Sequence, residues 1–384
     1  MTQASDIRAE PVHSGRVTDA ELARLRALIG KQVHIKEPPY LTELTRDAIR
    51  HWAWALGDRN PLFLDEAYAK GTVHRGIIAP PSILYAFSRM SIGYRGGLPG
   101  VHSMFGGTHW RWKEHGRLGD AITPEVTFKD LIELPSRFAG RMFKQISSID
   151  FRTADGRSLA QSESWGMRVE RTKAKEKGKY KELTENVQPY TPEQIQEIAK
   201  RMLEEKARGA QPLYFEDVEV GASVPEIVRG PYTATVAVAF EQAWGGLFVW
   251  AHAYWYDYLQ RHPAAGVLNG YGIPEPPEAV HWDTVLARSV GVPEAYDYGP
   301  ERISWISVML TNWIGDQGFL EELYCEIRRF NLVGDTTFCR GRITGKEELP
   351  DGRGRVKLIV EAVDQRDQIT AKGWATVLLP RRGG

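Results

Sequence analysis

Two stretches of this 384-residue sequence carry side chains that can exchange protons with a bound molecule. The first spans residues 57–65, reads GDRNPLFLD and contains Asp58. The second spans residues 278–283, reads EAVHWD and contains Glu278, His281 and Asp283. A carboxylate and an imidazole that are held at one site can act as general base and general acid. We therefore treat these four residues as candidate catalytic groups.

Local structure offers a second interpretation of the same residues. Asp58 and Asn60 stand in a Gly-Asp-x-Asn-Pro turn, where short polar side chains commonly bond to the nearby backbone. Asp65 and Asp283 each precede a short helical run, so an N-cap role is expected of them. His281 lies in an otherwise apolar stretch and can be a buried, hydrogen-bonded histidine.

The overall composition argues against several functions. Lys plus Arg and Asp plus Glu number 49 each, so no excess charge draws the chain to nucleic acid or to an anionic membrane. Residues 1–16 lack the pattern of a signal peptide, and no segment approaches the roughly 20 apolar residues that span a bilayer. These features predict a cytoplasmic protein. Cys325 and Cys339 are the only cysteines and predict packing thiols, with no metal site.

The elements that must position these residues repeat along the chain. Alternating apolar and polar residues predict strands at 122–131, 140–151 and 159–170, with a turn at Asp155-Gly156. The same order of strands returns at 336–346, 356–365 and 369–380, with a turn at Asp351-Gly352. Such alternation, with Gly and Asp at the joints, is typical of a half-buried antiparallel sheet.

A mostly apolar helical segment precedes each set of strands, at residues 80–93 and 301–315. A helix with little polar surface is best buried against a sheet that curls around it. One helix wrapped by an antiparallel sheet, formed twice, predicts an α+β protein with a tandem (double) hot-dog fold.

The expected domains are 1–170 and 213–384, joined by a charged linker with a helix over 171–212. Thr191, Pro192 and Gln194 have the pattern of an N-cap, a first-turn proline and a capping box, and predict a helix that runs to about Arg208.

The stretch from Arg46 to Pro81 resembles a known signature. Its segment 55–65, ALGDRNPLFLD, is similar to that of MaoC-like acyl dehydratases and (R)-specific, type-2 enoyl-CoA hydratases. The whole chain from Asp19 to Pro380 resembles their long double-hot-dog branch with a fatty-acid-synthase-like dehydratase domain. The resemblance implies a hydratase or dehydratase of acyl-CoA or carrier-linked acyl thioesters. In that family an Asp and a His handle water and a proton, and no metal, nucleotide or flavin is needed.

The resemblance also implies a place for the substrate. Amides at the N-terminal end of each buried helix are expected to hold the thioester oxygen, and Gly76 and Gly299 are the candidate positions. Asn60, Trp282 and His252 are further candidates for substrate binding. Twelve tryptophans, several near these stretches, are consistent with a bulky or aromatic acyl group, although Trp is also an ordinary core residue.

The sequence departs from the family pattern at one position in each half. Phe63 stands where the first half of the family motif has its catalytic His, and phenylalanine cannot transfer a proton. Aligning 278–283 with 60–65 places His281 opposite Phe63. The same alignment places Pro276 opposite Asp58, after an insertion at 252–277. Neither half therefore holds a complete Asp and His pair.

Three arrangements remain open. His281 can work in the second half with Glu278 or Asp283 as the carboxylate, which we favour. Asp58 and Asn60 can form a first-half site with another residue in the role of the His. Asp58 and His281 can also meet between the halves, which is the least expected arrangement. The competing functions are an acyl-CoA thioesterase and a non-catalytic acyl-CoA-binding subunit of a hydratase complex. Pairing of fused units into a homo-oligomer is possible.

Overall fold

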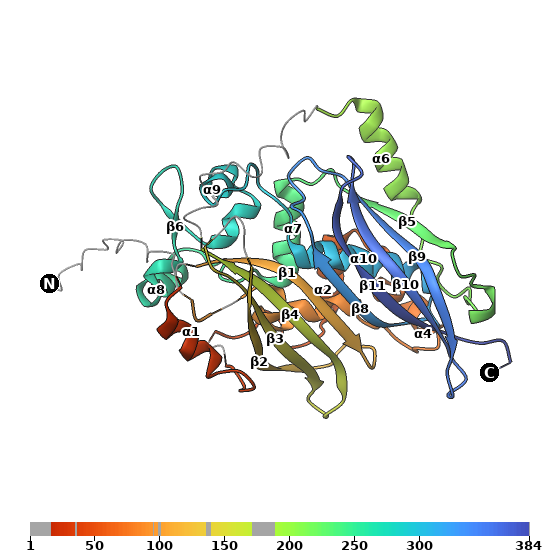
Figure 1. The fold of residues 1–384 in the computed structure, drawn as a ribbon. Helices are drawn as coiled ribbons and strands as arrows, with labels where there is room; N and C mark the ends of the chain where they lie inside the picture. Colours follow the sequence, from red (N-terminus) through yellow and green to blue (C-terminus); the bar gives the residue numbers. More distant parts are fainter. Residues whose placement is uncertain are drawn as a thin grey trace.

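A single antiparallel sheet organises the molecule. The computed structural model describes residues 17–34, 37–94, 96–98, 101–135, 140–170 and 189–383. Within these ranges nine strands hydrogen-bond in the order β2-β3-β4-β1-β8-β11-β10-β9-β5 (Figure 1). Their bounds are β1 His102–Trp112, β2 Ile122–Leu134, β3 Met142–Thr153, β4 Ser158–Val169, β5 Ser223–Arg229, β8 Phe319–Ile327, β9 Thr337–Glu348, β10 Gly354–Asp364 and β11 Ile369–Leu379. A small separate pair is formed by β6 Val267–Leu268 and β7 Pro274–Glu275.

The two halves of the chain build the two halves of this sheet. The order β2-β3-β4-β1 in the first half is mirrored by β9-β10-β11-β8 in the second, and the two sets join where β1 pairs with β8. That seam runs from Gly107 opposite Glu326 to Arg111 opposite Glu322. The repeated topology confirms the predicted α+β double hot-dog fold.

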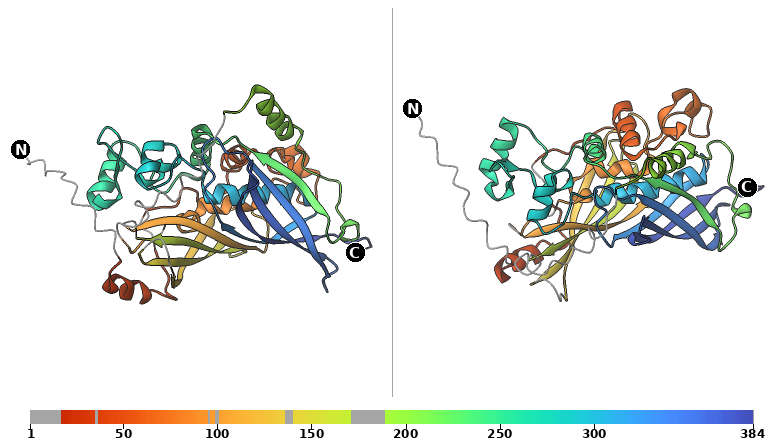
Figure 2. Two further views of the ribbon diagram at one scale, coloured as in Figure 1. Left: turned by 45° about the horizontal axis from the view of Figure 1, so that its top comes forward. Right: turned by 90° about the horizontal axis from the view of Figure 1, so that it is seen from above.

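The helices pack mainly on one face of the sheet, as the view from above in Figure 2 shows. The α-helices are α1 Asp19–Arg26, α2 Arg46–Leu56, α3 Pro61–Leu64, α4 Glu66–Lys70, α5 Arg89–Ile92, α6 Pro192–Glu204, α7 Ala234–Trp244, α8 Ala253–Arg261, α9 Thr284–Ser289 and α10 Gly299–Ile314. The 3-10 helices are η1 Pro81–Phe87, η5 Phe215–Asp217, η6 Pro263–Ala265 and η7 Pro277–His281. Among the described helices none is long and apolar enough to cross a membrane.

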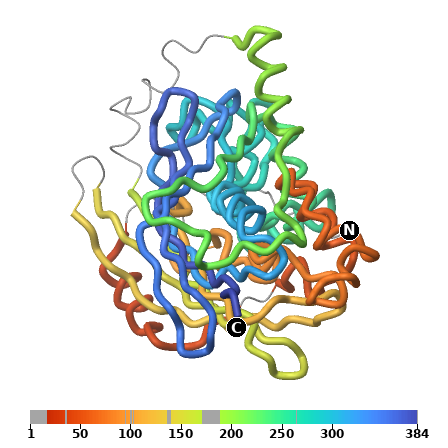
Figure 3. The backbone as a smooth tube through the Cα atoms, turned by 90° about the vertical axis from the view of Figure 1, so that its right-hand side faces the viewer, coloured from red at the N-terminus to blue at the C-terminus, as the bar shows by residue number. Residues whose placement is uncertain are grey.

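The central helix of the second half agrees with the prediction. Helix α10 spans Gly299–Ile314, and its residues from Pro300 onward are all buried. Figure 3 shows α10, in light blue, enclosed by the blue strands of the second half and the green segment around β5. Because β8 to β11 and β5 curl around it, a helix with little polar surface is shielded from water.

The first half differs from the prediction of one helix over 80–93. The segment instead forms the 3-10 helix η1, a break at Ser88 with extended backbone, and the short helix α5. At the break the chain turns Arg89 toward the second half, where its guanidinium donates to the carbonyls of Gly246 and Leu247. These hydrogen bonds join Arg89 to residues far along the chain, and the segment forms two short helices in place of one continuous helix.

The six predicted strands are confirmed as β2, β3, β4, β9, β10 and β11, while β1, β5 and β8 were not predicted. The predicted capping box at Thr191 and Gln194 is present, and α6 ends at Glu204 rather than near Arg208. Arg59 donates to the carbonyls of Met202, Leu203 and Glu205 and so caps that end. The linker 171–188 lies outside the described residues, so the domain boundaries stay a prediction.

Candidate active site

The two halves contain helices that are built alike. Helix α2 has Thr45 as N-cap and ends at Gly57 in the left-handed conformation, and α7 has Thr233 and Gly245 in the same roles. Both helices are eleven residues long. Gly suits such C-caps because it has no Cβ to oppose a positive φ. The shared geometry makes Gly246 the structural counterpart of Asp58.

Asp58 lies in a buried turn of the first half. Its Oδ1 accepts the backbone N–H of Asn60 at 3.0 Å, and its Oδ2 has no hydrogen-bond partner among the described residues. Burial raises the pKa of Asp58 to about 6. Asn60 is the N-cap of α3 and accepts the N–H of Leu62 at 3.1 Å. Phe63 is buried in the core, so the position of the family's His carries no imidazole in this half.

A buried ion pair between Arg229 of the second half and Glu205 of the predicted linker lies beside Asp58. Arg229 donates to the carbonyl of Leu56 at 2.7 Å and to both carboxylate oxygens of Glu205, at 2.6 and 3.0 Å. Side-chain exposure is 8% for Arg229 and 9% for Glu205. Asn312 of α10 also donates to Glu205. The first-half motif is therefore packed against structural groups of the other half.

The second half places His281 at the end of η7. Its Nδ1 lies 2.7 Å from the carbonyl oxygen of Tyr296. A carbonyl can only accept, so Nδ1 carries the proton and the lone pair of the neutral ring is on Nε2. Burial lowers the pKa of His281 to about 4, and the ring is therefore neutral at pH 7. A neutral imidazole with its lone pair on Nε2 can accept a proton.

Tyr298 connects His281 to a second buried group. The rings of Tyr298 and His281 are 3.7 Å apart between centroids, and the Tyr298 hydroxyl donates to Oε1 of Glu241. Oε2 of Glu241 is buried and lacks a partner within the described part of the chain. Burial raises the pKa of Glu241 to about 8, with a smaller contribution from the nearby charge of Glu278. Glu241 is thus mainly protonated at neutral pH.

Glu278 adds a further buried carboxylate, whose charge acts on Glu241. We call His281, Tyr298, Glu241 and Glu278 the His281 cluster. Its carboxylate is buried, neither oxygen is paired with another described residue, and burial raises its pKa to about 7. The guanidinium of Arg89 is the cation that opposes this rise. Glu278 therefore faces both Glu241 and a cation from the first half.

The remaining candidates have other positions. Asp283 is the N-cap of α9 and accepts the N–H groups of Val285 and Leu286. Trp282 is partly buried and packs against the small core under α9. His252 is exposed at the start of α8, with a positive φ.

The two glycines differ in their relation to a helix end. Gly299 is the first residue of α10 and directly follows Tyr298, which brings the N-terminus of this helix to the His281 cluster. A Cβ on Gly299 would lie 2.5 Å from Cδ1 of Phe105. Gly76 precedes a short stretch that pairs with 116–118 and does not start a helix. Their expected role in binding the thioester oxygen stays a prediction.

The structure thus gathers His281 and Glu278 but leaves Asp58, Asn60, His252 and Asp283 outside the cluster. The neighbours of Asp58 are Arg229 and Glu205, and those of His281 are Tyr296 and Tyr298, so the two sets share no residue. Glu241 and Tyr298 were missed. A sequence signal for Glu241 exists. When the segment from Thr233 to Gly245 is aligned with that from Thr45 to Gly57, Glu241 is a carboxylate opposite the apolar Ala53.

One cavity has Arg89 in its wall. Its volume is about 440 Å³ and its lining includes His34, Glu37, Phe87, Ser88 and Arg89. Arg89 belongs both to this wall and to the electrostatic surroundings of Glu278. The cavity is of the size of small-ligand pockets. His281 and Glu241 are not among its lining residues. The cavity is linked to the cluster through Arg89, whose charge acts on Glu278.

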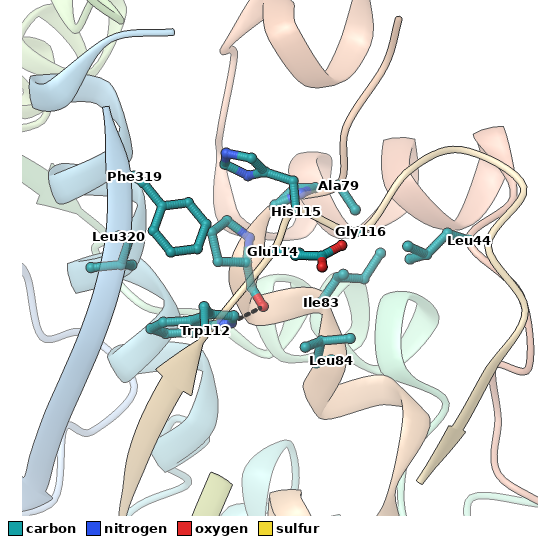
Figure 4. A pocket seen from close by; sticks show the side chains of 12 residues that line it. Leu44, Ala79, Ile83, Leu84, Trp112, Glu114, His115, Gly116, Phe319 and Leu320 are labelled. Carbon is teal, nitrogen blue, oxygen red and sulfur yellow. Dashed lines mark hydrogen bonds between the residues drawn. The ribbon is translucent and has the colours of Figure 1, made fainter. Parts of the chain in front are cut away.

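A second cavity is far smaller, about 20 Å³, and is drawn in Figure 4. His115, Glu114 and Trp112 of the first half line it together with Phe319, and Trp112 donates to the carbonyl of Pro81. Such a space holds about one water molecule. It contains none of the candidate catalytic residues and is too small for an acyl group.

Comparisons with known proteins agree with the fold and the motif. A model described as FAS1-like, dehydratase domain region, matches residues 27–145. The UPF0336 protein of Thermobifida fusca is 31% identical over 114 residues, which are 28% of this chain and 73% of that protein. The 3-oxo-4,17-pregnadiene-20-carboxyl-CoA hydratase alpha subunit of Mycobacterium tuberculosis is 42% identical over 45 residues. That match spans 12% of this chain and only 14% of the subunit.

Among solved structures, a protein described as a MaoC-like dehydratase superposes with a TM-score of 0.63 at 16% identity, over 93% of this chain and 99% of that one. At this identity the likeness supports the fold alone. The match to the UPF0336 protein shows that the chain belongs to that family, with a FAS1-like dehydratase domain region at residues 27–145, and the superposition shows the fold of a MaoC-like dehydratase.

Proposed function

We propose that this chain adds water to, or removes it from, an enoyl or 3-hydroxyacyl thioester such as an acyl-CoA, at a site in the second half. The observation that carries the proposal is the cluster of a neutral His281, buried carboxylates and the N-terminus of α10. Hydration of a conjugated thioester needs a base for the water, an acid for the α carbon and donors for the enolate oxygen. The cluster contains one group for each task.

The N-terminus of α10 is the proposed place of the thioester oxygen. The first N–H groups of a helix have no partner within the helix, and its dipole favours negative charge there. Gly299 directly follows Tyr298, whose ring contacts His281. A thioester bound at Gly299 would therefore present its neighbouring carbons to His281.

The 440 Å³ cavity beside Arg89 is the proposed route for the rest of the substrate. A bulky or aromatic acyl group, suggested by the many tryptophans, stays part of the proposal. Trp52, Trp244 and Trp305 are buried in the core and do not argue for it.

The test is to incubate the purified protein with a panel of enoyl-CoA thioesters of increasing size. Loss of the absorbance of the conjugated thioester, with formation of a 3-hydroxyacyl-CoA, supports the proposal. Release of free CoA would instead identify a thioesterase. Binding of acyl-CoA with neither product would identify a non-catalytic subunit, and either of these results contradicts the proposal.

A further inference from the structure

The two halves carry a carboxylate at different positions relative to the C-cap of the matched helices α2 and α7. In α2 the position equivalent to Glu241 is Ala53, and the residue after the C-cap is Asp58. In α7 the carboxylate is at Glu241 and the residue after the C-cap is Gly246. The second half therefore lacks the motif carboxylate after the C-cap but carries one a turn earlier in the helix.

The two positions are adjacent in space. A Cβ built on Gly246 would lie 2.4 Å from Oε2 of Glu241, so the Glu241 carboxylate lies where a side chain at 246 would begin. In the first half, the backbone N–H of Asp58 donates to the carbonyl of Ala53 at 2.8 Å, which shows the same closeness of the two sites. The Glu241 carboxylate therefore lies at the position that corresponds to the side chain of Asp58 in the first half.

We propose, on the basis of the function proposed above, that Glu241 is the catalytic carboxylate partner of His281. Tyr298 holds the pair together, because its hydroxyl donates to Oε1 of Glu241 while its ring lies against His281. The other oxygen, Oε2, is buried and has no hydrogen-bond partner among the described residues. A buried unpaired oxygen is costly to a protein, so it points to a partner that arrives with the ligand.

The other two carboxylates fit this role less well. Both N–H groups of the α9 N-terminus that Asp283 can reach are bonded to its Oδ1, so this side chain is held as a helix cap. Glu278 faces Arg89, which lies at the cavity wall and counters its charge. Glu241 alone combines the motif position with the link through Tyr298 to His281.

The protonation states assign the roles of the pair. In hydration, Nε2 of neutral His281 takes a proton from water as the water oxygen bonds to the β carbon. The π electron pair of the double bond moves toward the α carbon, which takes the proton of the Glu241 carboxylic acid. The proton on His281 then returns to the Glu241 carboxylate, directly or through solvent. One water is added and both side chains regain their starting states.

The test compares Glu241→Gln with Asp316→Asn in the full chain. Gln keeps the shape and can still accept from Tyr298 but cannot donate an acidic proton. Asp316 is a matched control, because it is also buried, accepts the hydroxyl of Tyr68 at 2.7 Å and has a second oxygen without a described partner. Hydration by Glu241→Gln is expected to fall about 10²-fold or more, chiefly in kcat, whereas Asp316→Asn stays near wild type.

A pH profile gives a second readout should the rate of Glu241→Gln be lowered for structural reasons. Burial sets the pKa of Glu241 to about 8, with Tyr298, Tyr232 and Glu278 as the titratable groups around it. Wild-type hydration should therefore decline as pH rises through about 8, because the acid is lost. The residual activity of Glu241→Gln should lack this decline, and a decline that persists unchanged overturns the inference.

The outcomes also separate this inference from the proposed function. If His281→Ala is inactive while Glu241→Gln keeps the wild-type rate, the site stands and Glu241 is not its acid. If the wild-type protein hydrates no member of the thioester panel, both proposals fail.

Discussion

The motif segment of the first half and the cluster of the second start from the same local design and end in different surroundings. An eleven-residue helix capped by Thr and Gly precedes each, directly in the first half and with α8 in between in the second, and each contains an Asp that caps the short helix after it. The first has kept the Asp58 motif but lost the imidazole and is packed against Arg229 and Glu205. The second has lost the motif carboxylate after its C-cap but holds His281 among buried acids.

The comparison shows that the motif segment and the proposed site lie in different halves of one chain. The two halves also pack together through their helices, because α2 contacts both α7 and α10. Fusion lets the two copies diverge, because each position needs to serve only one of the two sites.

Breaking the ion pair of the first half is the largest change expected. Arg229→Met leaves Glu205 buried without its main cation and should lower the free energy of unfolding by roughly 3–5 kcal/mol. Urea denaturation measures this loss. Arg50→Met, which removes an exposed pair with Asp47, should cost no more than about 1 kcal/mol. Equal effects of the two changes would contradict a structural role for the Arg229 pair.

The pH dependence of stability gives a second test of the first half. Burial raises the pKa of Asp58 from 3.8 to about 6, so the folded state binds this proton more tightly than the unfolded state. The resulting stability is present below pH 3.8 and is lost as pH rises through about 6. At 1.36 kcal/mol per pKa unit, wild type should lose roughly 3 kcal/mol relative to Asp58→Asn between pH 3.5 and 7. If the urea midpoints of the two proteins change equally with pH across this range, Asp58 does not titrate with a raised pKa in the folded state.

Removing the imidazole tests the second half directly. His281→Ala should reduce hydration by about 10²-fold or more, equivalent to roughly 2.7 kcal/mol, because the proton acceptor is lost. Asp58→Asn, assayed on the same substrate, should stay within a few-fold of wild type. The reverse pattern would move the working site to the first half.

The smallest effects are expected at the matched helix caps. Asp65→Ala and Asp283→Ala each remove a side chain that accepts two backbone N–H groups, and each should cost about 1 kcal/mol of stability. Thermal unfolding of the two variants checks the match. A loss of hydration that appears in Asp283→Ala but not in Asp65→Ala, at equal stability, would show that Asp283 takes part in the chemistry.

Much of the fold could be predicted because its signals are local. Alternation of apolar and polar residues marked β2 to β4 and β9 to β11, and the apolar segments marked both central regions. The strands β1 and β8 escaped prediction, although they form the seam. In β1 the pattern is interrupted by Gly106 and Gly107, and glycine is required at 107 because a Cβ there would meet the carbonyl of Cys325 in β8 at 2.3 Å. This requirement for glycine arises only when β1 pairs with β8, so the local sequence does not reveal it.

The site was predictable only in part for the same reason. His281 could be found because its distance from Asp283 repeats that of Phe63 from Asp65, which is a property of the chain alone. Glu241 could not be found by searching next to His281, since 39 residues, the inserted segment among them, lie between the two.

The amino-acid sequence by itself determined the repeated strands, the capped helix that starts at Thr191 and the place of the family motif, because each depends on residues close together in the chain. The tertiary structure alone decided that Arg89 reaches the loop after α7, that Arg229 packs beside Asp58, and that Glu241 meets Tyr298 and His281. Those contacts join remote segments, and burial there sets which groups hold a proton.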